Sequence, residues 1–195
     1  MNRFLTTAMA IFSISNPLLS ASWEAIHGNE VGGAGIAEKN IIFGYMSLTR
    51  YIELCLSAES CRLTPEERKT LSKIHKTMPS ELPVEQAIVF KSEAKEPGFF
   101  LIDGLVRIAK TSYHVGSPIF VNVDLLYTSA KDSEQRPLSL PGAVALLIHE
   151  LGHHHNVPSH QQLDILGSKV QTVLSGHTQN INGGPRLRTI EATVI

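Results

Sequence analysis

The sequence lacks the composition expected of a nucleic-acid-binding or repeat protein. Its 195 residues include 17 Lys and Arg against 18 Asp and Glu, and the basic residues form no stripe. Proteins that bind nucleic acids usually carry a basic patch, so we do not expect this chain to bind DNA or RNA. We find no internal repeat, and the length suits one domain with a substantial core.

The chain also has little cysteine, only Cys55 and Cys61. No second pair is present to complete a cysteine zinc site. In an exported chain, two cysteines this close together favour a local disulfide. Free thiols remain the alternative, because the pairing argument depends on export.

The N-terminal segment has the pattern of a signal peptide covering residues 1–21. Arg3 precedes an apolar stretch, and Leu19-Ser20-Ala21 provides small residues for cleavage. Asn16 and Pro17 interrupt the apolar stretch, so we expect no stable membrane insertion after cleavage. An uncleaved anchor or a buried helix is the alternative. We therefore expect a secreted or periplasmic protein with a flexible lead-in at 22–37 and one domain at 38–195; its oligomeric state is open.

The pattern of apolar residues predicts an α+β fold. Helical spacing from Ile41 to Cys55 indicates one helix ending near Ser57, and Thr64 starts another that should stop before Pro79. Apolar runs at 87–90 and 99–102 predict strands joined by a turn, as a hairpin or as neighbours, and 119–124 predicts a third strand. We expect a small mixed or antiparallel sheet packed against an active-site helix and further helices.

The most informative stretch lies between Ala143 and Val170. Ser139 is a suitable N-cap for an apolar helix that contains the motif HELGH, in which His149, Glu150 and His153 form the HExxH pattern. Histidines four residues apart share one helix face, so both imidazoles can reach one metal ion. The neighbouring Glu150 could hold and deprotonate a metal-activated water.

A catalytic zinc site needs a third protein ligand and an open position for water. Asn156 can end the first helix in the left-handed conformation, and Ser159 can cap a second helix that begins with His160. The chain reversal would bring His160 back towards the metal. Asp164, one turn further on, is either a partner that orients a ligand histidine or the alternative third ligand. His154 and His155 should either face solvent or be helix-end residues, where the helix dipole favours them. His27, His75, His114 and His177 should be surface or hydrogen-bonded histidines.

Over residues 140–170 the chain resembles the zincin metallopeptidases. HELGH on an apolar helix after a strand carries the resemblance, with features of both metzincin-like and gluzincin-like patterns. His160 falls one residue later than the metzincin ligand, and no methionine follows Met78. The His160 and Asp164 spacing is similar to the Glu and Asp pair of gluzincins, with His in place of Glu.

The resemblance implies a zinc-dependent peptidase (hydrolase) acting on a peptide or protein substrate, with Glu150 as general base and Zn²⁺ on His149, His153 and His160. By analogy, a substrate would lie along the edge of the strand at 119–123. Candidate donors to the reacting carbonyl oxygen are Tyr113, His114, Tyr127 and His177. Two other functions remain open: a non-catalytic metal-binding protein, given five histidines between 149 and 160, or a degenerate zincin that serves as an interaction module.

Overall fold

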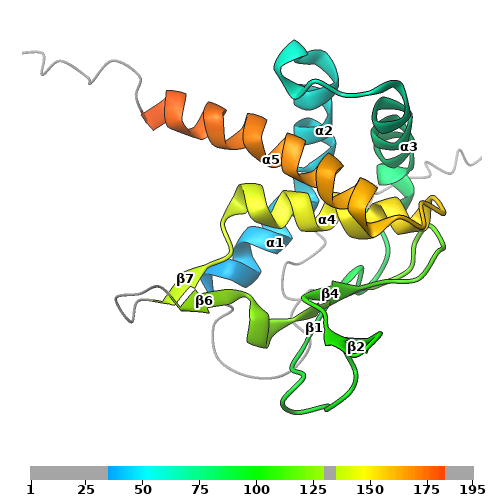
Figure 1. Cartoon of the computed structure of the whole chain (residues 1–195), viewed down its shortest axis with the longest axis vertical. Coiled ribbons are helices and arrows are strands. Elements are labelled where there is room, and N and C mark those ends of the chain that lie inside the picture. The colour runs from blue at the N-terminus through cyan, green and yellow to red at the C-terminus, as the bar shows by residue number, and fades with distance from the viewer. Residues whose placement is uncertain (1–34, 130–134, 183–195) are drawn as a thin grey trace, which may run out of the picture.

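The computed structural model describes residues 35–129 and 135–182, with the side chains of the last helix described as far as Gly176. As expected, this part of the chain is α+β, with five α-helices and three small sheets (Figure 1). The helices are α1 (Ile36–Met46), α2 (Leu48–Ser57), α3 (Pro65–Glu81), α4 (Leu140–His154) and α5 (His160–Asn182). The strands are β1 (Ile88–Lys91), β2 (Leu101–Ile102), β3 (Leu105–Val106), β4 (Ala109–Lys110), β5 (Ile119–Asn122), β6 (Tyr127–Ser129) and β7 (Gln135–Pro137).

Helix α4 is the central element, with α5 on one side, α1 on another and the strands beyond (Figure 1). Ser139 caps it as predicted, because the Ser139 hydroxyl accepts a hydrogen bond from the Gly142 N–H. Most of its apolar side chains lie in the core, including Val144, Leu147 and Leu151. A helix buried on most sides is held rigidly by its neighbours, which makes α4 a firm base for functional side chains.

The main sheet has the order β1-β5-β4. Strand β1 pairs with β5 in parallel, with Ile88 opposite Ile119, and β4 pairs with β5 in antiparallel fashion. The expected pairing of the first two strands is therefore wrong, since β2 pairs with β3 instead. Both edges of β5 are hydrogen-bonded, so the expectation that a substrate lies along this strand is also wrong. The edge nearest α4 belongs to β4.

Three helix boundaries differ from the sequence expectations. The helix expected between Ile41 and Ser57 is divided at Ser47, whose ψ of 5° ends α1. Helix α3 starts at the predicted capping box but continues through Pro79 to Glu81. Proline removes one N–H donor, yet the turn continues because the Leu82 N–H still bonds to the Met78 carbonyl. Helix α1 begins at Ile36, before the expected start of order at Glu38.

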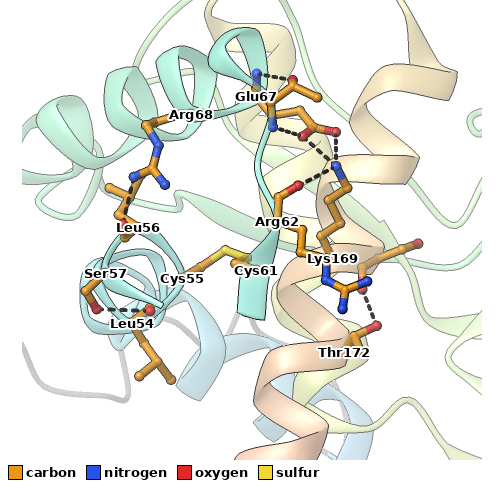
Figure 2. Close-up of a disulfide and its surroundings, with 12 residues drawn as sticks. Leu54, Cys55, Leu56, Ser57, Cys61, Arg62, Glu67, Arg68, Lys169 and Thr172 are labelled. Carbon is orange, nitrogen blue, oxygen red and sulfur yellow. Dashed lines mark hydrogen bonds and ion pairs between the residues drawn. A yellow bond between two sulfur atoms is a disulfide. The ribbon is translucent and has the colours of Figure 1, made fainter. Parts of the chain in front are cut away.

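A disulfide joins Cys55 and Cys61, whose Cα atoms are 5.4 Å apart (Figure 2). It closes the connection between α2 and α3, next to α5. The Lys169 ammonium group from α5 donates to the Arg62 carbonyl at 3.0 Å and to the Glu67 carboxylate at 2.6 Å (Figure 2). Together these contacts attach the middle of α5 to the start of α3.

The proposed signal peptide, most of the lead-in and the C-terminal tail lie outside the described residues. Within the part that is described, no helix is both long and apolar enough to cross a membrane.

Candidate metal centre

Close packing of α5 on α4 creates the site. Gly152 of α4 lies so near Leu163 that a Cβ at this position would collide with the leucine side chain. In α5, a Cβ on Gly167 would come within 2.8 Å of the Ala145 carbonyl oxygen. Since both glycines lack a side chain, the two helices approach closely. His160, at the start of α5, thereby reaches the face of α4 that carries the HExxH motif.

The three histidines predicted as metal ligands converge. One ring nitrogen from each of His149, His153 and His160 lies within 4.8 Å of the other two. The Nε2 atoms of His149 and His153 are 3.2 Å apart, and His149 Nε2 lies 3.0 Å from His160 Nδ1. This group could hold a metal ion.

In two of the three histidines, the ring nitrogen that points away from the cluster lies close to a hydrogen-bond acceptor. His149 Nδ1 lies 2.8 Å from a carboxylate oxygen of Asp164, and His153 Nδ1 lies 3.0 Å from the Val157 carbonyl oxygen. These acceptors place the ring protons on Nδ1 and leave the lone pairs on Nε2. Two lone pairs facing each other at 3.2 Å repel unless a cation lies between them. The arrangement fits a metal ion better than it fits a network of hydrogen bonds.

The spacing and the charge state of the histidines also suit a bound metal ion. Two ligands at about 2.05 Å on a tetrahedral zinc are roughly 3.3 Å apart, close to the observed separations. Burial lowers the pKa of His149, although Asp164 opposes the shift. Burial, followed by the charges of His149 and His160, lowers the pKa of His153 to about 4. Both imidazoles are therefore neutral near pH 7, as metal ligands must be.

Glu150 follows the first of these histidines and faces the same cavity. It is 5% exposed, and no hydrogen bond to its carboxylate comes from the residues that the structure describes. Burial, with a smaller contribution from the Asp164 charge, raises its pKa to about 8. A carboxyl group without a donor, next to three histidine side chains, is available for proton transfer.

A cavity of about 710 Å³ covers the histidines and Glu150. Its opposite wall comes from the segment at 107–113, which contains β4. Of the three sequence-predicted donors whose side chains the structure describes, only Tyr113 lines this cavity, and its ring centre lies 5.6 Å from that of His153. Sequence reasoning missed Arg107 and Lys110, two cations on the same wall. Neither stands in a motif, so no sequence pattern indicated them.

The other sequence-predicted donors lie elsewhere. The Tyr127 hydroxyl donates to Glu38 at 2.8 Å, beside α1, and His114 is exposed outside the cavity lining. His27 and the side chain of His177 lie outside the described residues. His75 behaves as expected, since it contacts Glu53 at 3.0 Å on the surface.

His154 ends α4, as one of the two expectations had it, but the alternative that it faces solvent is wrong. Its side chain is fully buried, with Nδ1 2.8 Å from the Glu81 carboxylate and Nε2 2.8 Å from the Thr111 hydroxyl. The second carboxylate oxygen of Glu81 accepts the Gly116 N–H at 2.9 Å. A buried polar group needs such partners, and they lie far from His154 in the sequence. His155 is half-buried and contacts the Thr77 hydroxyl at 3.1 Å.

Comparison with known proteins identifies no relative: no protein-family model, no curated protein and no solved structure matches this chain. Functional interpretation therefore depends on the residues of the site.

Proposed function

We propose that this protein is an exported zinc metallopeptidase with His149, His153 and His160 as zinc ligands and Glu150 as general base. The observation that carries the proposal is the convergence of three histidine side chains beside an unpaired carboxylate in one open cavity. A structural zinc site would close its coordination with a fourth protein ligand. Here the described residues contribute only three groups to the cluster, which leaves room for a water molecule or a substrate.

Asp164 supports this assignment of ligands. Its carboxylate lies against Nδ1 of His149, on the opposite side of the ring from the nitrogen that faces the other histidines. That position suits an orienting partner better than the alternative role of third ligand.

When bound, zinc supplies Lewis acidity, which makes a water molecule easier to deprotonate and polarises a carbonyl group. The Glu150 carboxylate accepts the proton of the attacking water and returns it to the leaving amine. A cation held by the histidines favours the ionised form of Glu150, opposing the effect of burial. Along the cavity wall, the free edge of β4 can hold an extended peptide through main-chain hydrogen bonds.

The burial of His154 argues against a metal-sequestering protein. His154 and His155 are occupied by Glu81, Thr111 and Thr77, so only three of the five clustered histidines share a site. Glu150 would also have no role in sequestration.

Export is supported by the disulfide, because disulfides persist mainly in oxidising compartments. If the N-terminal segment is a cleaved signal, N-terminal sequencing of the exported protein should begin near Ser22. An intact Met1 on the exported protein would contradict cleavage.

The test of the enzymatic proposal is Glu150→Gln in the full chain. The zinc-loaded protein is incubated with a mixture of synthetic peptides, and the products are identified by mass spectrometry. We expect cleavage to fall at least about 1,000-fold in this variant while one zinc per chain is retained. Glu85→Gln, an exposed carboxylate away from the cavity, is the matched control and should cleave normally. Cleavage that persists in Glu150→Gln would contradict the proposed mechanism.

A further inference from the structure

The cavity contains a cation that has no anionic partner. The Nε atom of Arg107 is shielded from solvent and has no hydrogen-bond partner, and it is the sole such atom among the buried side-chain nitrogens and oxygens of the described residues. No carboxylate of the described residues lies within ion-pair distance of its guanidinium group. Leaving a buried donor unpaired costs about 1–3 kcal/mol, and the described residues do not satisfy this guanidinium group.

The backbone at Arg107 is fixed on both sides. Its N–H donates to the Phe100 carbonyl at 3.0 Å, and its carbonyl accepts from the buried side chain of Asn122 at 3.4 Å. The guanidinium group therefore extends from an anchored point next to β4. It lines the same cavity as His149, Glu150 and Asp164.

The charge of the cavity favours an anion. Lys110 lines the wall beside Arg107, and its ammonium group contacts the Phe99 carbonyl and lies 3.6 Å from the Phe99 ring centre rather than against a carboxylate. Arg107 and Lys110 balance Glu150 and Asp164 in formal charge. A divalent cation on the histidines then makes the cavity net positive, which attracts an anionic substrate group.

We propose that Arg107 binds a carboxylate of the peptide substrate, so that this protein prefers peptides with a carboxylate close to the cleaved bond. The N–H groups on the two terminal nitrogens of a guanidinium group form a fork that matches the two oxygens of a carboxylate. Either a free C-terminal carboxylate or an Asp or Glu side chain can supply that group. The inference depends on the proposed peptidase function and names its substrate class.

The experiment uses two pairs of synthetic peptide mixtures. In one pair the peptides carry either a free C-terminal carboxylate or a carboxamide, and in the other pair they carry either Glu or Gln at internal positions. We compare cleavage by the zinc-loaded wild type, Arg107→Gln, Arg107→Lys and the control Arg50→Gln, whose arginine is exposed on α2. Zinc content and the melting temperature are measured for each variant.

We expect the wild type to prefer the carboxylate member of one pair by about 10-fold or more in kcat/KM, as hydrogen bonds to a charged group allow. This preference should be lost in Arg107→Gln because KM for the carboxylate peptide rises. It should be reduced in Arg107→Lys, which keeps the charge but not the fork. It should persist in Arg50→Gln. The pair that shows the preference identifies the source of the carboxylate.

Equal cleavage of both members of each pair by the wild type would overturn the inference, as would a preference that persists in Arg107→Gln. Both results would leave the peptidase proposal intact. A different failure, in which the zinc-loaded wild type cleaves no peptide, would overturn the peptidase proposal and this inference with it.

Discussion

Two neighbouring histidines at the end of α4 have opposite environments. His153 belongs to an open cluster with His149 and His160, where its Nε2 faces the Nε2 of His149 and a cavity. His154 belongs to a closed cluster, in which the Glu81 carboxylate and the Thr111 hydroxyl occupy its two nitrogens. One position along a helix turns a side chain by about 100°, which suffices to separate the two environments. Satisfied groups hold the structure together, whereas unsatisfied ones remain available to a ligand.

The largest effects are expected when each of the two histidines is replaced separately by alanine. In His153→Ala a zinc ligand is lost, so zinc affinity should fall by more than about 100-fold, beyond the effect of losing an orienting partner. In His154→Ala the chain should keep its zinc, but Glu81 loses its partner in the core. Leaving a buried polar group without its hydrogen-bond partner costs about 1–3 kcal/mol, and the free energy of unfolding should fall by at least that amount.

The measurements are zinc titration against a chelator of known affinity and unfolding by urea. Loss of zinc from a folded His154→Ala protein would contradict the separation of the clusters. Tight zinc binding by His153→Ala would contradict the claim that the open cluster binds the zinc.

A smaller effect is expected for Asp164→Asn. The amide can still accept from His149 Nδ1, but without the negative charge that makes the imidazole a stronger ligand. Zinc affinity should fall by about 10- to 100-fold, within the range for partners that orient a ligand. A loss of zinc affinity as large as that in His153→Ala would instead indicate that Asp164 binds the zinc directly. Glu93→Gln, remote from the cluster, should leave zinc affinity unchanged.

The smallest effect concerns the pH dependence of the metal-free protein. The pKa of His153 is about 4 in the folded state, mainly because of burial, and about 6.5 when the chain is unfolded. Between these values the unfolded chain binds the proton and the folded protein does not, so acidification favours unfolding. The stabilising contribution is complete above pH 6.5 and is lost as the pH falls towards 4.

The stability of the metal-free wild type relative to His153→Gln should therefore decrease from pH 7 to pH 4. We expect a change of order 1 kcal/mol, below a limit of about 3 kcal/mol at 1.36 kcal/mol per pKa unit. Urea unfolding of both proteins across this range measures the difference. A difference that is constant with pH would show that His153 is not held neutral by the fold.

The same comparison explains which features could be predicted from the sequence. The caps at Thr64, Ser139 and Ser159 and the left-handed Asn156 were predicted correctly, because each depends on residues a few positions away. The α+β class followed from periodicity. The chain reversal that brings His160 back towards α4 could be predicted because it follows from a short turn, whereas the close packing at Gly152 and Gly167 was not predicted.

Features that depend on distant residues could not be predicted. Glu81 lies 73 residues before His154, and no local pattern indicates that the two meet in the core. The parallel pairing of β1 with β5 and the placement of Arg107 in the cavity likewise arise from the tertiary fold. The spacing in the sequence correctly predicted that His154 points away from the metal ligands. It did not indicate which side chains surround His154 in the fold.

The most direct test of the account is X-ray absorption at the zinc edge of the zinc-loaded full chain. We predict one zinc per chain with three histidine nitrogens at about 2.0–2.1 Å and one oxygen from water, and loss of one nitrogen in His160→Ala. The spectrum should not change in Glu150→Gln, in which the ligands are intact. Four protein ligands around the zinc, or a spectrum that is the same in His160→Ala, would contradict the open three-histidine site.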